Sequence, residues 1–393
     1  MKHPTRREFL GAAGLAAGAF LARPSLLRAS TAPSGRVAIG LCPEYNSQVM
    51  DTLAKMFDQL GGLEKLVRNK TVAIKLNMTG GPNMKLNGLP VEMTTWAHPE
   101  VIGATVALMG KAGAKRIRLL ESHTAGANSL ESFMGSANWK VQDIANGAKT
   151  VEFENTNYLA GHKEYARFMV PGSPKMYAGY DLNPSYRDND VMVSMAKLKN
   201  HRAAGITLSM KNMFGMLPTT IYGMNAPVDE PSPTVLAGNR AGMCHQGMRV
   251  PPKSAPPAID VTSHEVGYRM PHVVPELVSA RPIHLAIVDG VYSMEGGELP
   301  SRDPAQGASN PLHPGVLIAG LNPVCTDAVA TAVMGFDPMA DRGTPPFETA
   351  DSMLKYAEEL GLGTRDLKKI EVVGAPVSKA VYKYKSVYQL RPA

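Results

Sequence analysis

The stretch HPEVIGATVALMGKAGAKRIRLLES, residues 98–122, decides the fold class of this chain. Its apolar residues first recur at the three-to-four spacing of an amphipathic helix, and Gly113 marks the end of that helix. The run IRLL at residues 117–120 then predicts a strand. The segment KTVAIKLN, residues 70–77, predicts another strand before the helix. A strand, a helix and a second strand in this order are typical of a parallel α/β sheet.

The same alternation continues along the chain. Further strands are predicted at residues 35–41, 189–199, 283–290, 313–320 and 368–374, and further helices at residues 322–335 and 348–363. Several of the strand runs are apolar without alternation, which indicates strands that are covered on both faces. We therefore expect an α/β fold with a mostly parallel sheet and helices on both faces.

Two stretches interrupt this rhythm. Residues 155–187 are rich in Tyr, Gly and Pro, and residues 219–261 contain NAPVDEPSPTV and RVPPKSAPPA. Long Pro- and Gly-rich segments in a compact domain are often covers over a binding site. We expect a loop insertion at about 219–261 within a single α/β domain that spans residues 33–393.

The first 32 residues predict a twin-arginine signal peptide. Arg6 and Arg7 precede an apolar stretch that is rich in Gly and Ala, and small residues follow at 29–32. We expect cleavage there and export by the twin-arginine translocation machinery to the periplasm or otherwise out of the cytoplasm. The apolar stretch is short, so no stable membrane span is expected after cleavage.

Charge and cysteine content exclude some classes of function. Residues 1–29 carry five of the 41 basic and one of the 34 acidic residues, so the rest of the chain has a net charge of only +3. We infer no nucleic-acid binding from so small an excess. The three cysteines, Cys42, Cys244 and Cys325, form no CxxC pair. A cysteine-ligated iron–sulfur cluster is therefore not expected, and nothing selects a disulfide pair.

Polar residues follow five of the predicted strands. Ligands of open parallel sheets bind beyond the carboxyl ends of the strands, so we expect these residues on one edge of the sheet. They are Lys75 and Asn77; Glu121; Lys197, Lys199 and His201; Asp289 and Glu295; and Asp327, which follows Asn322.

The stretch MAKLKNHRAAGITLSMKNMFG, residues 195–215, has the densest group of these candidates. Lys197, Lys199 and His201 alternate and would share one face of an extended segment. Thr207 and Lys211 are four residues apart, so a helix over about 203–214 would align them. Lysines and amides beside a helix start suit a phosphate or a carboxylate.

We assign candidate roles on this basis. Proton transfer is assigned to His201, Lys199, Glu121 and Asp289. Ligand binding is assigned to Lys75, Asn77, Lys197, Thr207, Lys211, Asn212, Glu295 and Asp327. The sequence leaves the identity of any metal or organic cofactor open.

Each of these residues also has an ordinary structural interpretation. Strand-end lysines are commonly solvated, Asn322 before a proline suits a helix N-cap, and Asp327 suits the first turns of a helix. At the level of function, an enzyme acting on a small anion is the first hypothesis. A non-catalytic periplasmic binding or accessory protein is the second, and a metal- or redox-cofactor-dependent protein is the third.

Five blocks of the sequence resemble a known bacterial family. They are VAIKLN, HPEVIGATVALMGKAGAKRIRLLES, KLKNHRAAGITLSMKNMFGMLP, IVDGVYSMEGG and VLIAGLNPVCTDAVATAVMGFDP. In this order they are similar to the blocks of the family called domain of unknown function 362. The resemblance places His98 and Gly296, along with the candidates above, in the family's blocks. Many members also carry a ferredoxin-like cysteine cluster, which this chain lacks. The resemblance therefore implies a fold more than a reaction.

Overall fold

The computed structural model describes residues 35–123, 128–233, 238–301, 303, 305 and 307–392. These residues belong to one compact unit that spans residues 32–393. The predicted signal peptide lies outside the described residues. None of the helices within the described ranges is long and apolar enough to cross a membrane.

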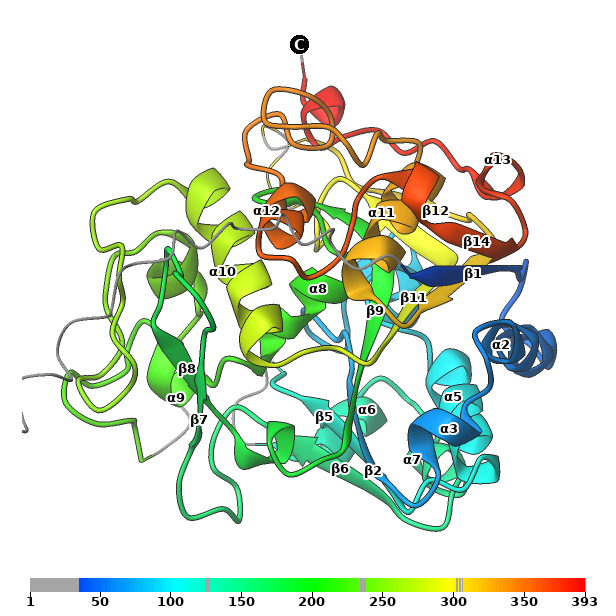
Figure 1. Ribbon diagram of the computed structural model, residues 1–393, viewed down its shortest axis with the longest axis horizontal. Coiled ribbons are helices and arrows are strands. Elements are labelled where there is room, and N and C mark those ends of the chain that lie inside the picture. Colours follow the sequence, from blue (N-terminus) through cyan, green and yellow to red (C-terminus); the bar gives the residue numbers. More distant parts are fainter. Residues whose placement is uncertain are drawn as a thin grey trace, which may run out of the picture. The chain divides into compact units, whose positions relative to one another are not determined.

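The described chain is built on a ten-stranded sheet (Figure 1). Along the main path its order is β14–β1–β13–β11–β9–β2–β5–β6, with β10 beside β9 and β12 beside β11. The strands are β1 (Arg36–Leu41), β2 (Thr71–Lys75), β5 (Arg116–Glu121), β6 (Val151–Asn155), β9 (Val191–His201), β10 (Gly205–Ile206), β11 (Leu285–Glu295), β12 (Asn310–Leu312), β13 (Val316–Gly320) and β14 (Glu371–Gly374). On this path, β13 alone runs against the others. The predicted fold class is confirmed.

Helices cover both faces of the sheet because its central strands are apolar on both sides. On β9, Val193 and Met195 join the hydrophobic core on one face, while Met192 and Ala196 join the core on the other. The first core packs α2 (Gln48–Gln59), α5 (Pro99–Lys111), α6 (Leu130–Gly135) and α7 (Val141–Ala145). The second packs α8 (Leu208–Asn212), α10 (Val266–Ala280), α11 (Pro323–Val333) and α12 (Met353–Glu359). Figure 1 shows the two groups of helices apart from one another.

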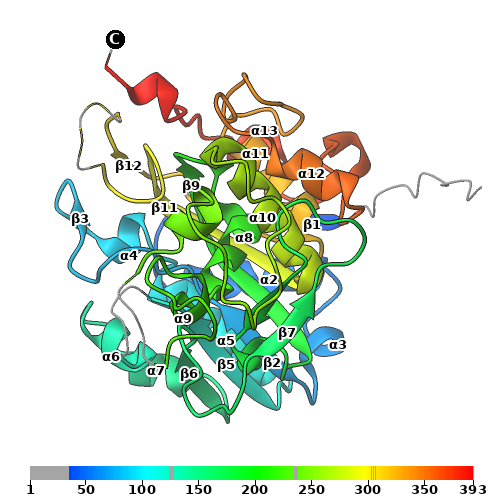
Figure 2. The same ribbon diagram turned by 90° about the vertical axis from the view of Figure 1, so that its left-hand side faces the viewer.

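The two irregular stretches contain short elements of their own. Residues 155–187 include the hairpin of β7 (Ala166–Met169) and β8 (Gly179–Leu182). Residues 219–261 include α9 (Thr219–Tyr222) and the single-turn π-helix η3 (Ala241–His245). Figure 2 turns this side toward the viewer, with α9 and α10 in front of the sheet.

The remaining described elements are short. They are α3 (Glu64–Val67), β3 (Lys85–Leu86), β4 (Leu89–Pro90), α4 (Val91–Thr94), η1 (Pro184–Tyr186), η2 (Met213–Met216), η5 (Leu367–Lys369), α13 (Val377–Ala380) and η6 (Tyr388–Leu390).

Two predictions about these elements were wrong. The helix expected over about 203–214 is instead β10, the five-residue α8 and the 3-10 turn η2. Leu208 at its start has φ +47, a left-handed conformation that interrupts a regular helix. The strand over 313–320 was expected to run parallel to the others, but β13 is antiparallel to them. Asn322, which follows β13, therefore lies at the edge of the sheet opposite to the carboxyl ends of the parallel strands. Asn322 caps α11 there by accepting from the Cys325 amide at 3.0 Å.

Candidate functional site

The candidate site lies where the order of the strands reverses. The chain runs from β2 outward to β5 and β6 on one side, and then returns to β9 and β11 on the other side. The carboxyl ends of β2, β5 and β9 meet at this reversal, which is where open α/β sheets bind ligands. A cavity of about 510 Å³ lies here, a volume suited to a small molecule. Its wall includes Lys75, Asn77, Glu121, Asn157, His201, Thr207, Lys211, Asn212, Phe214, Thr219, Arg240, His245 and Glu298.

A buried ion pair joins β2 to β5 at this cavity. Lys75 Nζ lies 2.6 Å from Glu121 Oε1 and also donates to the Leu76 carbonyl. The same carboxylate accepts from the Met78 and Ser122 amides at 2.9 Å each. Burial lowers the pKa of Lys75, and the Glu121 carboxylate opposes that shift. Both oxygens of Glu121 are thus already occupied by donors.

Asn212 ties α8 to the two strands at the reversal. Its Nδ2 donates to the carbonyls of Lys75 on β2 and Met195 on β9, at 3.1 and 3.2 Å. Its Oδ1 accepts from Asn77 Nδ2 at 3.1 Å. The other end of α8 is held by Asp327 of α11, which accepts from the Ser209 and Met210 amides. Together these contacts fix the position of Lys211 between them.

Lys211 is buried beside the cavity, and no described carboxylate lies within ion-pair distance of its amine. Its Nζ lies 4.6 Å from the centroid of the Phe214 ring and forms no ion pair with any described residue. Burial lowers the pKa of Lys211 to about 8; Glu298 opposes this shift, while Arg240 and Lys75 add to it. The Lys211 amine can therefore gain or lose a proton near neutral pH.

Arg240 brings a second, partly buried cation to the same wall. Its Nη2 donates to the Ser122 carbonyl at 2.9 Å and to Asn157 Oδ1 at 2.8 Å, and its Nε donates to the Leu217 carbonyl. It forms no ion pair within the described part of the chain. Burial lowers the pKa of Arg240, against the attraction of Glu121. Arg240 was missed in the sequence because it stands in an irregular stretch where no periodic pattern marks it.

His201 is neutral at physiological pH. Burial chiefly lowers its pKa to about 3, against the attraction of Glu298. Its Nδ1 accepts from the Ala203 amide at 3.0 Å, so its proton is assigned to Nε2, which faces Glu298 Oε2 at 3.8 Å. The pKa of Glu298 is lowered to about 2, since His201 and other nearby donors and cations outweigh its burial. Glu298 therefore stays ionised.

His245 lines the cavity beside His201 and Phe214. Its ring centroid lies 6.3 Å from that of His201 and 5.1 Å from that of Phe214. Burial lowers its pKa well below the usual value, so this ring is neutral too. Arg240 and His245 both come from the stretch 219–261, which supplies part of the cavity wall.

Several predicted site residues do not line the cavity. Lys197 and Asp289 form an ion pair at 3.0 Å with both side chains fully buried, and Tyr45 bonds to both. Lys199 donates to the carbonyls of Thr95 and Glu298, and its pKa is lowered to about 7, chiefly by burial.

Two further candidates serve contacts between elements. Glu295 accepts from Asn310 Nδ2 and from the Lys385 amide, which ties β11 to β12 and to the C-terminal segment. Asp327 holds the start of α8, and burial raises its pKa to about 7 against the hydrogen bonds that it accepts. The predicted residues that reach the cavity are therefore Lys75, Asn77, Glu121, His201, Thr207, Lys211 and Asn212.

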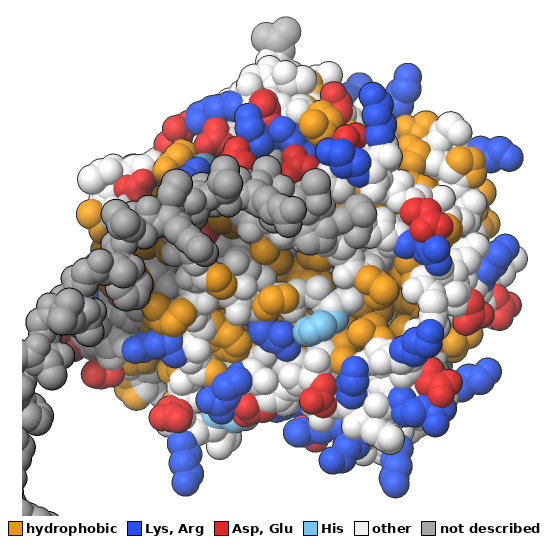
Figure 3. Space-filling view, viewed as in Figure 1, with side chains coloured by type: hydrophobic (Ala, Val, Ile, Leu, Met, Phe, Trp, Pro, Cys, Tyr) orange, Lys and Arg blue, Asp and Glu red, His pale blue; other side chains and the backbone are white. Residues whose placement is uncertain are grey.

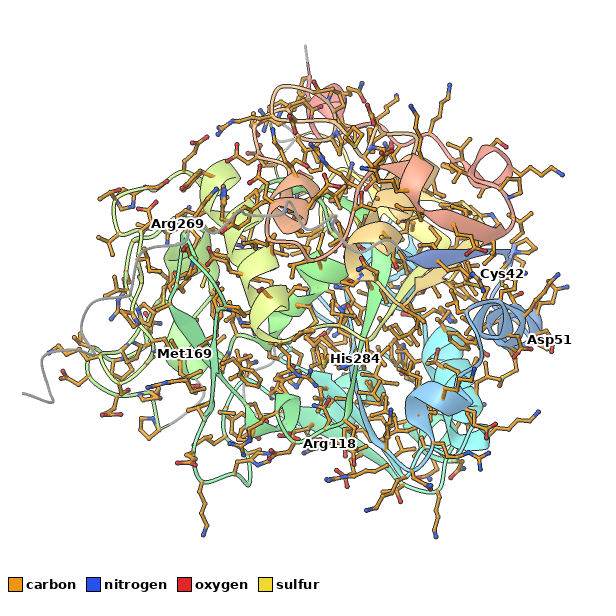
Figure 4. All side chains as sticks on the ribbon, viewed as in Figure 1. Cys42, Asp51, Arg118, Met169, Arg269 and His284 are labelled. Carbon is orange, nitrogen blue, oxygen red and sulfur yellow. The ribbon has the colours of Figure 1, made fainter. Side chains whose placement is uncertain are left out.

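The cysteines and potential metal ligands of the described residues do not gather into a metal site. Cys42, Cys244 and Cys325 are buried, and no disulfide joins any two of them. Figure 4 labels Cys42, which follows β1 and lies beside α2. Within the described ranges, no three His, Cys, Asp or Glu side chains form a group that could hold a metal ion.

Comparisons with known proteins place this geometry in context. The model of the family described as Domain of unknown function (DUF362) matches residues 72–332. No curated protein matches the chain. Among solved structures, the chain is similar to the crystal structure of a protein from Thermotoga maritima, with 12% sequence identity and a TM-score of 0.35. That similarity covers 65% of this chain and 52% of the other, so the chain spans about half the length of that protein.

Proposed function

We propose that this chain, which belongs to the domain of unknown function 362 family, is an enzyme that binds a small carboxylate or phosphate in the cavity. One observation carries the proposal: Lys211 is buried and Arg240 partly buried on the cavity wall, and neither forms an ion pair with a described residue. A buried cation without a counter-charge costs several kcal/mol. An anion held between these two groups would compensate both.

The balance of charge on the wall agrees with this. Lys75, Lys211 and Arg240 are cationic, Glu121 and Glu298 are anionic, and the nearby histidines are neutral. The wall thus has one positive charge in excess. On the outer face shown in Figure 3, by contrast, acidic and basic side chains are interspersed. The excess positive charge that supports anion binding is therefore the one on the cavity wall.

The same residues suggest a division of roles. Lys211 is the best candidate for proton transfer, because its pKa of about 8 lies near physiological pH. His201, with its proton on Nε2, would donate a hydrogen bond to the ligand or to Glu298. Glu121 already accepts three hydrogen bonds, so we assign it to holding Lys75 in place.

We further propose that this enzyme acts outside the cytoplasm after export by the twin-arginine machinery. Arg6 and Arg7, the mild apolar stretch and the small residues at 29–32 support that route. Because this machinery carries folded chains, the cavity would be formed before export.

The binding proposal can be tested by thermal melts of Lys211→Met in phosphate and in a panel of small carboxylates. Lys175→Met is a matched control, because Lys175 Nζ also lies over an aromatic ring, at 4.3 Å from the Tyr356 centroid, but outside the cavity. We expect an anion to stabilise the parent and Lys175→Met. Lys211→Met should lose that response and melt, without ligand, at the same or a higher temperature than the parent.

A Lys211→Met protein that responds to every anion as the parent does would overturn the proposal. Native mass spectrometry of the purified parent would show any anion retained from the cell. Turnover of a stabilising anion supports an enzyme. Tight retention of an anion without turnover would instead identify a binding protein.

A further inference from the structure

Three residues that line the cavity each have a buried polar atom without a hydrogen-bond partner in the described part of the chain. These atoms are Asn77 Oδ1, Thr219 Oγ1 and His245 Nε2. A buried polar atom without a partner costs about 1–3 kcal/mol, and native proteins keep few of them. Three such atoms around one cavity indicate a site built for a ligand with polar groups of its own.

The orientation of the Asn77 amide follows from its neighbours. Asn212 Nδ2 faces the carbonyls of Lys75 and Met195, which only accept hydrogen bonds, so the other atom of that amide must be its oxygen. Asn212 Oδ1 in turn requires a donor from Asn77, and Asn77 Nδ2 supplies it at 3.1 Å. The atom of Asn77 left without a partner is therefore its oxygen, which can only accept.

A ligand that satisfies Asn77 must therefore bring a donor, either a hydroxyl group or an ammonium group. The wall already has excess positive charge from Lys75, Lys211 and Arg240, which disfavours a second ammonium in the cavity. A neutral hydroxyl group adds no charge. Thr219 can donate or accept, and so can the neutral His245, so both suit further oxygen atoms of a hydroxylated molecule.

We propose that the anion bound in this cavity carries a free hydroxyl group that donates to Asn77 Oδ1. The ligand class is thus a hydroxy carboxylate or a phosphate ester with a free hydroxyl group. This inference rests on the proposed function, since Lys211 and Arg240 hold the anionic end. It adds the hydroxyl requirement, which the cations alone do not impose.

Matched pairs of probes that differ by one hydroxyl group test the inference. Lactate is compared with propionate, malate with succinate, and 2-hydroxypropyl phosphate with propyl phosphate, by calorimetry or thermal shift on the intact protein. Binding of the first two pairs would identify a carboxylate ligand, and binding of the third pair would identify a phosphate ligand. In at least one pair, the hydroxylated member should bind roughly tenfold more tightly or better.

A variant then assigns the preference to Asn77. Asn77→Leu keeps the side-chain shape and should reduce the ratio of affinities within that pair to about one. Asn189→Leu is the control, since Asn189 bonds to Ser185, Tyr186 and Arg281 away from the cavity, and it should keep the parent ratio. If Asn77→Leu does not fold, the ratios for the parent protein still decide the matter.

The outcomes separate this inference from the proposed function. If both members of every pair bind the parent equally, the hydroxyl requirement is overturned while anion binding stands. If Asn77→Leu still prefers the hydroxylated member, the assignment to Asn77 is overturned, because a different group must then bind the hydroxyl. If no member of any pair binds, the proposed function itself fails.

Discussion

At the scale of single residues, two buried lysines of this chain differ in the partners that surround them. Lys197 is fully buried but has Asp289 at 3.0 Å, so its charge is balanced within the fold. Lys211 is also buried, but its described surroundings offer the Phe214 ring in place of a carboxylate. Both lysines looked alike in the sequence, because spacing along the chain says which face a side chain takes and not which partner it meets.

Replacing Asp289 should therefore lower the stability of the folded protein, and not only its activity. Asp289→Asn leaves the Lys197 ammonium buried without a counter-charge, and we expect the free energy of unfolding to fall by about 3–5 kcal/mol. Asp229→Asn breaks a pair with Lys253 whose side chains are 76% and 77% exposed, and should change stability by less than about 0.5 kcal/mol. Urea unfolding of both variants checks this. Equal losses would show that burial does not govern the Asp289 pair.

Anion binding should weaken as the pH rises through about 8. Below that pH, Lys211 is protonated in the free protein and its ammonium attracts the ligand. Above it, binding must take up a proton, so each further pH unit should lower the affinity by up to about tenfold until the pKa of the bound state is reached. Glu298 and His245 also face Lys211 and keep their charge state near pH 8, because the pKa of each is lowered well below that value. Arg240 and Lys75 face it too, and burial lowers the pKa of both. Lys199, whose pKa is lowered to about 7 chiefly by burial, is a further group near Lys211 that titrates in this range.

Calorimetric titrations with the tightest-binding probe from pH 6.5 to 9.5 measure this dependence. Lys211→Arg keeps its charge throughout that range and should bind with a nearly flat pH profile. A falling profile that persists in Lys211→Arg would assign the titration to a different group.

At the scale of elements, periodicity predicted the central strands and the helices α5 and α11 well. The direction of β13 could not be predicted, because a short apolar run reads the same in either direction. The helix α10 was missed because Pro271 and Pro275 stand inside it. Pro271 has no amide hydrogen to donate to the Gly267 carbonyl, four residues before it in the helix. That carbonyl accepts a hydrogen bond from the Asp351 amide at 2.7 Å instead. That contact joins residues far apart in the chain.

The turn that follows α8 should tolerate no side chain at Gly215. An added Cβ would lie 2.7 Å from Lys75 Nζ and 3.3 Å from Glu121 Oε1, so Gly215→Ala would push the β2–β5 ion pair apart. We expect a loss of about 1–3 kcal/mol in stability and weaker anion binding. Gly135→Ala is the control, since a Cβ there meets nothing within 4 Å, and it should be neutral or slightly stabilising. Unfolding curves that do not separate the two variants would contradict this account.

At the scale of the whole molecule, the site exists only because of the order of the strands. The reversal between β2 and β9 brings Lys75, Glu121, His201 and Lys211 together from distant parts of the sequence. The general rule for open α/β sheets predicted which edge to examine, and seven of the candidates line the cavity there. Arg240 and His245 could not be predicted, because their positions depend on how an irregular segment packs across the sheet.

The proposed export also concerns the whole chain, and under that proposal it requires two side chains of the signal. Replacing Arg6 and Arg7 together by lysine keeps the charge of the signal and removes the guanidinium pair that defines the twin-arginine route. Arg23→Lys with Arg28→Lys is the matched control, because it makes the same change outside the pair. Fractionation should find the first variant as uncleaved precursor in the cytoplasm and the control cleaved and exported. Because the cavity residues lie beyond the signal, that precursor should respond to anions as the mature protein does. Normal export of the Arg6 and Arg7 variant would show that the chain leaves by a different route, or that its basic N-terminus is only a tail.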